Sequence, residues 1–198
     1  MNIVILLFNE FETLDVFGPV EIFGRLPQYY NLRYHSLQGG MISNHHGVHL
    51  QTEGLDFIPD KIDILLIPGG RGVRKEVHDK HFIDNLIALI RKSNYVLSIC
   101  TGSALLAQTG YLNNKHATSN KLALPWVSSL NQKVHWNKRA RWVADGNFYT
   151  SSGVSAGIDM CLCFVAEQHG YQVAIQVAKE IEYHWIEDRL NDTFALSD

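Results

Sequence analysis

A buried strand that runs directly into one cysteine is the feature that most constrains this chain. Residues 95–104 read Tyr-Val-Leu-Ser-Ile-Cys-Thr-Gly-Ser-Ala, so an apolar run ends at Cys100 and a stretch of small residues follows at once. Small residues let a helix begin immediately and pack close to the strand. The pattern is typical of a nucleophile elbow, a strained turn that presents one side chain at the carboxyl end of a sheet. A simple buried cysteine at a strand end is the less favoured alternative.

Two other apolar runs predict neighbouring strands. Ile3–Phe8 and Ile62–Ile67 are continuous and rich in β-branched residues, as expected for strands buried on both faces of a parallel sheet. Strands that alternate with helices indicate an α/β sandwich. The other expected segments are helices at Val16–Leu26, with Pro19 in the first turn, Phe82–Arg91, Gly102–Thr109, Gly157–His169 and Val173–Trp185, and strands at Leu32–Leu37, His49–Thr52, Ala140–Val143 and Phe148–Ser151.

Length and charge exclude several classes of function. The chain has 198 residues and a net charge of −3, which fit one domain over residues 1–198 without a nucleic-acid footprint. The N-terminus lacks the basic region and cleavage site of a signal peptide, and its apolar run is too short to span a membrane. We therefore expect a cytoplasmic protein with neither nucleic-acid nor membrane partners.

No group of residues has the spacing of a metal site. His45, His46 and His49 have no cysteine or acidic partner at ligand spacing, so solvated loop histidines are the favoured interpretation. Cys161 and Cys163 are interpreted as small buried hydrophobic residues. We expect neither a metal nor another cofactor.

Several groups are expected around Cys100. The helix that follows should lower the pKa of the thiol, because its N-terminus carries partial positive charge and free N–H groups. If the strand Ile62–Ile67 is adjacent, the N–H groups of Gly70 and Thr101 would form an oxyanion hole; a turn that requires glycine is the alternative for Gly70. Asp15 follows the first strand, so it is either a general acid and base or a helix N-cap. Glu21 is a second carboxylate, either in the pocket or solvated.

Together with other motifs, these residues resemble the DJ-one/PfpI superfamily (also written DJ-1/PfpI). The similarity is greatest to its isonitrile hydratase-like branch, which also supplies the N-terminal domain of some AraC-type regulators. The resemblance runs from Asn2 to about Tyr183. The motifs that carry it are Leu14-Asp15-x-x-Gly18-Pro19-x-Glu21-x-Phe23, Pro68-Gly69-Gly70, Ser98-Ile99-Cys100-Thr101-Gly102-Ser103, Ala117-Thr118, Ala140-Arg141-Trp142-Val143-x-Asp145-Gly146 and the stretch Ser151 to Asp159.

The resemblance implies a flavodoxin-like three-layer sandwich with a mostly parallel sheet, assembled as a homodimer. It also implies a small-molecule substrate. Cys100 would attack the carbon of an isonitrile, a thioimidate would form, water would add, and an N-substituted formamide would leave. Asp15 would position water and move protons, while Thr101 and Gly70 would shape the oxyanion hole.

Three departures from the family pattern bear on this mechanism. Asn120, a candidate pocket residue, stands where branch members carry histidine, which removes a base. Thr101 stands where the protease-like branch has histidine, so a Cys-His protease is disfavoured. The segment after Tyr183 replaces a proline-rich tail. In addition, His184 and Glu187 lack the His-x-Glu spacing of class I glutamine amidotransferases.

Three functions are therefore weighed. The first is a cysteine-dependent, isonitrile hydratase-like lyase. The second is a non-enzymatic redox- or metabolite-sensing protein with an oxidisable Cys100; no helix-turn-helix follows the domain, which speaks against direct gene regulation. The third is deglycase or glyoxalase-like chemistry, whose relatives usually carry glutamate in place of Asp15.

Overall fold

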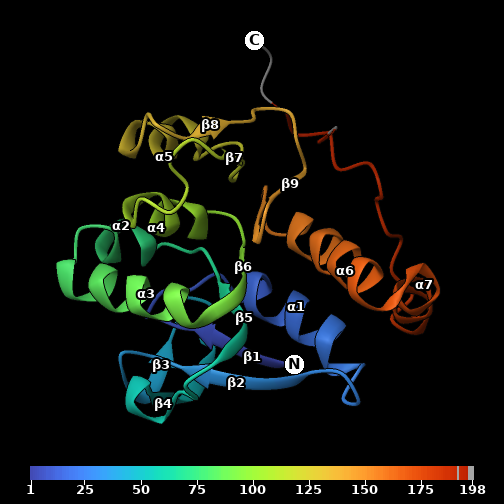
Figure 1. Ribbon diagram of the computed structural model, residues 1–198, viewed down its shortest axis with the longest axis horizontal. Helices are drawn as coiled ribbons and strands as arrows, with labels where there is room; N and C mark the ends of the chain where they lie inside the picture. Colours follow the sequence, from blue (N-terminus) through green and yellow to red (C-terminus); the bar gives the residue numbers. More distant parts are fainter. Residues whose placement is uncertain (191, 196–198) are drawn as a thin grey trace.

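The computed structural model describes residues 1–190 and 192–195, and within them a mixed sheet runs through the centre (Figure 1). Its eight strands lie in the order β3-β4-β2-β1-β5-β6-β10-β9, and only the pairs at the two edges, β3–β4 and β9–β10, are antiparallel. The strands are β1 (Asn2–Leu6), β2 (Asn31–His35), β3 (Gln38–Ser43), β4 (His49–Gly54), β5 (Ile62–Ile67), β6 (Ser93–Ser98), β9 (Trp142–Asp145) and β10 (Phe148–Ser151).

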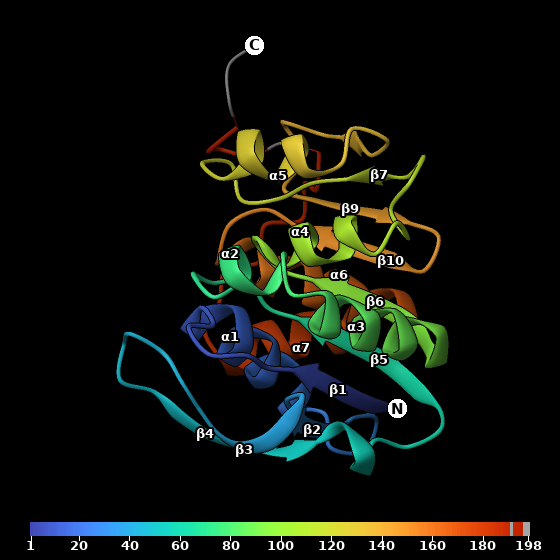
Figure 2. The ribbon, with the colours of Figure 1, turned by 90° about the vertical axis from the view of Figure 1, so that its left-hand side faces the viewer.

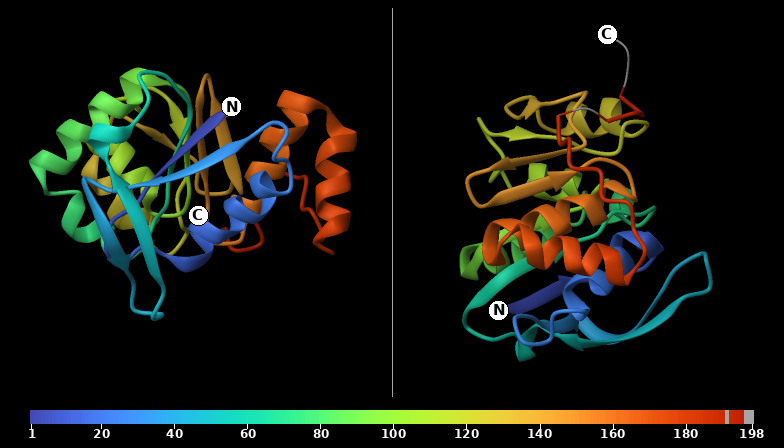
Figure 3. Two further views of the ribbon diagram at one scale, coloured as in Figure 1. Left: turned by 90° about the horizontal axis from the view of Figure 1, so that it is seen from below. Right: turned by 90° about the vertical axis from the view of Figure 1, so that its right-hand side faces the viewer.

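Helices cover both faces of this sheet and complete the three-layer α/β sandwich. Seen from below, one helical layer lies on each side of the strands (Figure 3). One face carries α2 (Val73–Glu76), α3 (Lys80–Lys92) and α4 (Gly102–Gln108), and the other carries α1 (Thr13–Gly24), α6 (Ala156–His169) and α7 (Tyr171–Glu180). The predicted fold class is confirmed.

The three strongest strand predictions occupy the middle of the sheet. β1 pairs with β5, and β5 pairs with β6, in each case in parallel. Most of the side chains of β1 and β5 and those of the second half of β6 are buried, which explains why the sequence shows continuous apolar runs rather than alternation. Since parallel neighbours end at the same edge, the segments that follow β1, β5 and β6 meet there.

A small accessory unit lies beyond the β9 edge. It consists of α5 (Leu124–Leu130) and the two short parallel strands β7 (His116–Ala117) and β8 (His135–Trp136). Figure 2 shows this unit above β9 and β10, at the opposite end of the molecule from β3 and β4. The sequence analysis did not predict it, nor α2 and the glycine-containing β3, because these segments are short and weakly patterned.

Two helices, α1 and α7, differ most from their predicted bounds, while the other predicted helices agree to within two residues at each end. α1 begins at Thr13, so Pro19 lies inside the helix rather than in its first turn. α7 ends at Glu180 instead of continuing to Trp185. Beyond α7 the chain reverses at Glu182, which has a positive φ of 51°, and Trp185 then donates from Nε1 to the Asp159 carbonyl at 3.2 Å. Tertiary contacts with α6 therefore end the helix.

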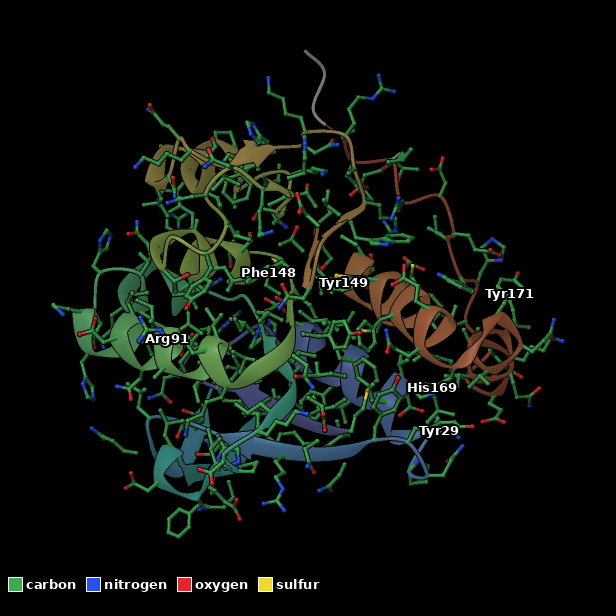
Figure 4. All side chains as sticks on the ribbon, viewed as in Figure 1. Tyr29, Arg91, Phe148, Tyr149, His169 and Tyr171 are labelled. Atoms are coloured by element: carbon green, nitrogen blue, oxygen red, sulfur yellow. The ribbon has the colours of Figure 1, made fainter. Side chains whose placement is uncertain are left out.

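Aromatic side chains join α6 to its neighbours (Figure 4). The ring of Tyr29 stacks on that of His169, with centroids 4.0 Å apart. Tyr149 of β10 donates its hydroxyl to Glu167 of α6 at 2.6 Å. These contacts hold α6 against the sheet. No helix in the described residues is both long and apolar enough to cross a membrane.

Candidate functional site

Cys100 occupies the turn between β6 and α4 in a backbone conformation that is rare for a side chain. Its φ is 56°, in the left-handed region. A Cβ on Gly102 would lie 2.5 Å from the Ile67 carbonyl oxygen, so only glycine lets α4 begin this close to β5. The predicted nucleophile elbow is confirmed.

The backbone of Cys100 is held by distant segments. Its N–H donates to the Ser152 carbonyl at 3.1 Å. Its carbonyl accepts hydrogen bonds from the hydroxyls of Ser103 and Ser119, each at 3.0 Å. Since both serines are fully buried, these bonds offset much of the cost of the strained turn. Sequence reasoning did not identify Ser119 or Ser152; the only signal was their place in the motif blocks around Thr118 and Gly153.

Asp15 lies in the first turn of α1 and is completely buried. Its Oδ2 accepts the Gly69 N–H at 2.8 Å, and its Oδ1 has no hydrogen-bond partner in the described part of the chain. The N-cap of α1 is Glu12, so the interpretation of Asp15 as an N-cap is wrong. The Asp15 carboxyl instead faces the end of β5, where a Cβ on Gly69 would meet both Asp15 Oδ2 and the N atom of Thr101, so the carboxyl lies next to the Cys100–Thr101 turn.

Burial controls the ionisation of both groups. It raises the pKa of Asp15 well above its usual value, and the Glu12 carboxylate adds to this, against a smaller opposing effect of the Gly69 N–H. Burial is also the largest cause that raises the pKa of the Cys100 thiol, and the charge of Asp15 is the second. The Thr101 N–H lowers this pKa and so opposes the shift. The expected lowering of the thiol pKa is therefore wrong in direction. A protonated Asp15 can donate a proton to a substrate, which a carboxylate cannot.

Thr101 and Gly70 lie beside this pair. The Gly70 N–H donates to Thr101 Oγ1 at 3.1 Å, and Gly70 has a φ of 132°, which favours glycine. A Cβ on Gly69 would lie within 2.8 Å of Thr101 Oγ1, Thr101 N and Asp15 Oδ2, so these polar groups converge on one point. The structure thus brings together Gly70 and Thr101, the two residues predicted to form an oxyanion hole. The Gly70 N–H, however, already donates to the Thr101 hydroxyl oxygen.

The other two predicted pocket residues lie elsewhere. Glu21 pairs with Arg25 at 2.6 Å and lines a surface groove with Tyr183, so the structure does not bring it into the Cys100 site. Asn120 accepts the Ala123 N–H through Oδ1 at 3.1 Å. Its side chain lines a cavity of about 380 Å³ that adjoins the Cys100 site.

The loop histidines make polar contacts near the start of α1. His45 Nδ1 lies 3.2 Å from a Glu10 carboxylate oxygen, and His46 Nδ1 lies 2.7 Å from Thr13 Oγ1. Within residues 1–190 and 192–195, no three histidine, cysteine or acidic side chains are grouped to hold a metal ion. These histidines therefore serve as local hydrogen-bonding residues of the loop.

Comparison with known proteins decides the family. Residues 1–167 match the model of the DJ-1/PfpI family. The chain belongs to the DJ-1/PfpI family. Among DJ-1/PfpI structures, a THiJ/PfpI family protein from Pseudomonas syringae superposes with a TM-score of 0.84 at 25% identity, covering 92% of this chain and 74% of that one. DJ-1beta from Drosophila melanogaster superposes with a TM-score of 0.80 at 20% identity, over 93% and 98% of the two chains.

DJ-1/PfpI relatives of this chain carry different activities. The isonitrile hydratase of Pseudomonas putida is 30% identical, covering 92% of this chain and 78% of the relative. The deglycase PfpI of Pyrococcus furiosus is 27% identical, over 76% of this chain and 89% of the relative. The transcriptional regulator GbdR of Pseudomonas aeruginosa is also 27% identical, but the match spans 38% of that protein. Membership of the DJ-1/PfpI family therefore fixes the fold and leaves the reaction to the site.

Proposed function

We propose that this protein adds water to the carbon of an isonitrile and releases an N-substituted formamide. The observation that carries the proposal is that the buried Asp15 carboxyl and Thr101, the residue after Cys100, converge on Gly69 at the elbow. The Cys100 thiol and the Asp15 carboxyl thus supply a nucleophile and a proton donor at one turn, and the reaction needs both. The similarity to an isonitrile hydratase over 92% of the chain supports the same reaction.

The proposed reaction proceeds in two stages. Cys100 sulfur attacks the terminal carbon of the isonitrile while Asp15 gives that carbon a proton and the thiol proton passes to the nitrogen. A C–S and a C–H bond form, the S–H bond breaks, and a thioimidate protonated on nitrogen results. Asp15, now a carboxylate, takes a proton from water as the water oxygen adds to the same carbon. The C–S bond then breaks as the new hydroxyl becomes the carbonyl of the formamide and its proton moves to sulfur. The nitrogen keeps its proton, and both the thiol and the Asp15 carboxyl are restored. In sum, one isonitrile and one water give one formamide.

Thr101 is proposed to assist the water-addition stage. Its hydroxyl and N–H both lie near the Cys100 sulfur, where they can donate to the oxygen that develops in the tetrahedral intermediate. The Gly70 N–H already donates to Thr101 Oγ1. This hydrogen bond orients the hydroxyl so that its own proton is free for the intermediate.

The two alternative functions are weaker. A redox sensor needs an accessible thiolate, whereas Cys100 is 6% exposed and burial raises its pKa. Deglycase chemistry is supported only by relatives such as the 27% identical protein from Pyrococcus furiosus. We also propose, from the family resemblance, that the protein forms a homodimer in the cytoplasm; light scattering coupled to size exclusion tests the dimer.

Formamide production from cyclohexyl isonitrile tests the proposed reaction. We expect turnover by the wild type and by Cys163→Ser, a matched control at a partly buried cysteine away from the elbow. Cys100→Ser and Asp15→Asn are expected to lose it. Turnover retained in Cys100→Ser, or absent from the folded wild type, would overturn the proposal. Lactate formation from methylglyoxal above the rate of free thiol would then favour deglycase chemistry. Rapid oxidation of Cys100 by peroxide would favour the redox-sensor function.

A further inference from the structure

The cavity beside the Cys100 site is connected to it through three segments. Its wall includes Leu14, which precedes Asp15, and Asn120, which follows the serine bonded to the Cys100 carbonyl. It also includes Ser152, whose carbonyl accepts the Cys100 N–H. This cavity of about 380 Å³ therefore shares its wall segments with the Cys100 site.

Arg141, one of two basic residues in the wall, already has a matched partner. Its guanidinium donates from Nε and Nη2 to Asp159 Oδ2, at 2.7 and 2.5 Å. Both side chains are buried, so this pair neutralises itself inside the protein. Asp159 therefore compensates most of the Arg141 charge, although Arg141 still lowers the pKa of Lys121.

Lys121, the second basic residue, lacks such a partner. Its residue exposure is only 3%, and its Nζ donates to Thr118 Oγ1 at 2.8 Å and to the Ala140 carbonyl. Both acceptors are neutral, so no carboxylate in the described residues is hydrogen-bonded to this ammonium group. Burial lowers the pKa of Lys121 to about 8, which reflects incomplete compensation of its charge.

The chain places one carboxylate close to this ammonium without a direct bond. The C-terminal segment, residues 182–190 and 192–195, leaves α7 and runs back along α6 toward β9 (Figure 3). It brings Asp192 to the cavity, 3.7 Å from Arg141 Nη1, a separation beyond a hydrogen bond. Asp192 Oδ1 instead accepts the Phe194 N–H at 3.0 Å. Asp192 raises the pKa of Lys121, so it acts on the lysine through space.

The remaining wall is largely apolar and complements these charges. It includes five hydrophobic side chains: Leu14, Leu122, Val154, Ala156 and Phe194. A ligand that fits both parts has an apolar body and one anionic end. Its carboxylate could hydrogen-bond directly to the ammonium, which the tethered Asp192 does not, and charge-assisted bonds of this kind are strong.

We propose that Lys121 binds the carboxylate of a small organic anion in this cavity, where the anion displaces Asp192. Resting on the proposed function, this makes the preferred substrate an isonitrile that also carries a carboxylate on an apolar chain. Asp192 then acts as an internal competitor that weakens binding of the ligand. Lys121 is a specificity-determining residue in this scheme, since it contacts the substrate away from the reacting carbon.

Calorimetric titration with hexanoate and hexanamide tests the subsite without any catalysis. We expect the wild type to bind hexanoate at least about tenfold more tightly than hexanamide, a difference of about 1.4 kcal/mol. Lys121→Met should abolish this preference. Unchanged hexanamide binding and an unchanged melting temperature would show that the variant is still folded. Asp192→Asn, at a buried carboxylate of the C-terminal segment, should tighten hexanoate binding, whereas Thr193→Ala, at the exposed neighbouring position, is the control and should not.

Two binding results would overturn the subsite. The first is that hexanoate and hexanamide bind equally tightly to the wild type and also to Asp192→Asn. The second is that a folded Lys121→Met variant still prefers hexanoate to hexanamide as strongly as the wild type does. Formamide production from 6-isocyanohexanoate and from its methyl ester separates this proposal from the reaction. Turnover of both compounds at equal kcat/KM would contradict the carboxylate subsite and support the hydratase reaction. Acid-selective binding without turnover would support the subsite and contradict the hydratase reaction.

Discussion

The backbone N–H of Gly69 donates to Oδ2 of Asp15 at 2.8 Å and thereby joins the end of β5 to the first turn of α1. The bond positions a fully buried carboxyl group beside the Cys100 thiol. A carboxyl at this depth persists because a backbone donor satisfies one of its oxygens, while the other oxygen is left for the chemistry. The proposed catalytic pair thus lies where the segments that follow the parallel strands β1, β5 and β6 meet.

Removing the Asp15 carboxyl should make the thiol more acidic. The charge of Asp15 raises the pKa of Cys100, so we expect Asp15→Asn to shift the midpoint of Cys100 alkylation to lower pH. Peptide mass spectrometry after timed iodoacetamide treatment, repeated across pH, measures this midpoint. Glu21→Gln, which removes a carboxylate outside the site, should leave it unchanged. A midpoint that rises in Asp15→Asn would contradict the pKa assignment.

The two serine hydroxyls at the Cys100 carbonyl should support each other. Ser103→Ala or Ser119→Ala alone leaves one hydrogen bond, so each should cost about 1 kcal/mol of unfolding free energy. The double variant leaves the buried carbonyl without either donor, and its loss should exceed the sum of the single losses. Urea denaturation of the four proteins measures the coupling, and strictly additive losses would argue against a shared role.

Breaking the Arg141–Asp159 pair should be costly and should release the C-terminal segment. Asp159→Asn leaves the buried Arg141 guanidinium without its hydrogen-bonded counter-ion, and losses of about 3–5 kcal/mol are typical. Asp159 Oδ1 also accepts bonds from the Tyr183 hydroxyl and the Ile186 N–H. Trypsin should therefore cut after Arg189 sooner in this variant than in Glu187→Gln, an exposed control. Equal cleavage rates would show that Asp159 does not anchor the segment.

Lys121 should titrate far below an ordinary lysine. Burial lowers its pKa from 10.5 to about 8, and Asp192 partly opposes the shift. Asp192→Asn removes that opposing charge, so the pKa should fall further. NMR of protein labelled with ¹³C at the lysine side chains follows the titration directly. Bound hexanoate should move the pKa upward, and a wild-type midpoint near 10.5 would contradict the burial of this ammonium.

The same shift has a consequence for stability. Because the folded pKa of Lys121 lies below its unfolded value, the unfolded chain binds more protons between about pH 8 and 10.5. The contribution of Lys121 to the unfolding free energy should therefore rise as pH increases through this window. Comparing the wild type with Lys121→Met by urea denaturation at several pH values isolates that contribution.

The sequence by itself determined the central part of the fold and its reactive residue. Continuous apolar runs predicted β1, β5 and β6, since strands buried on both faces leave no polar alternation. The apolar run that ends at Cys100 predicted the elbow, because only small residues let a helix start so close to the sheet. These features are local, so they can be recognised from neighbouring residues alone.

Only the tertiary structure decided the surroundings of that cysteine. Ser119 and Ser152 hold its backbone from segments that no local pattern connects to it. The direction of its pKa shift follows from burial by the whole fold, which outweighs the helix N-terminus considered in the sequence. Asp192 reaches the cavity because α7 ends early and the chain folds back onto Asp159. Desolvation and long-range contact depend on all elements together, and therefore appear only once the chain is folded.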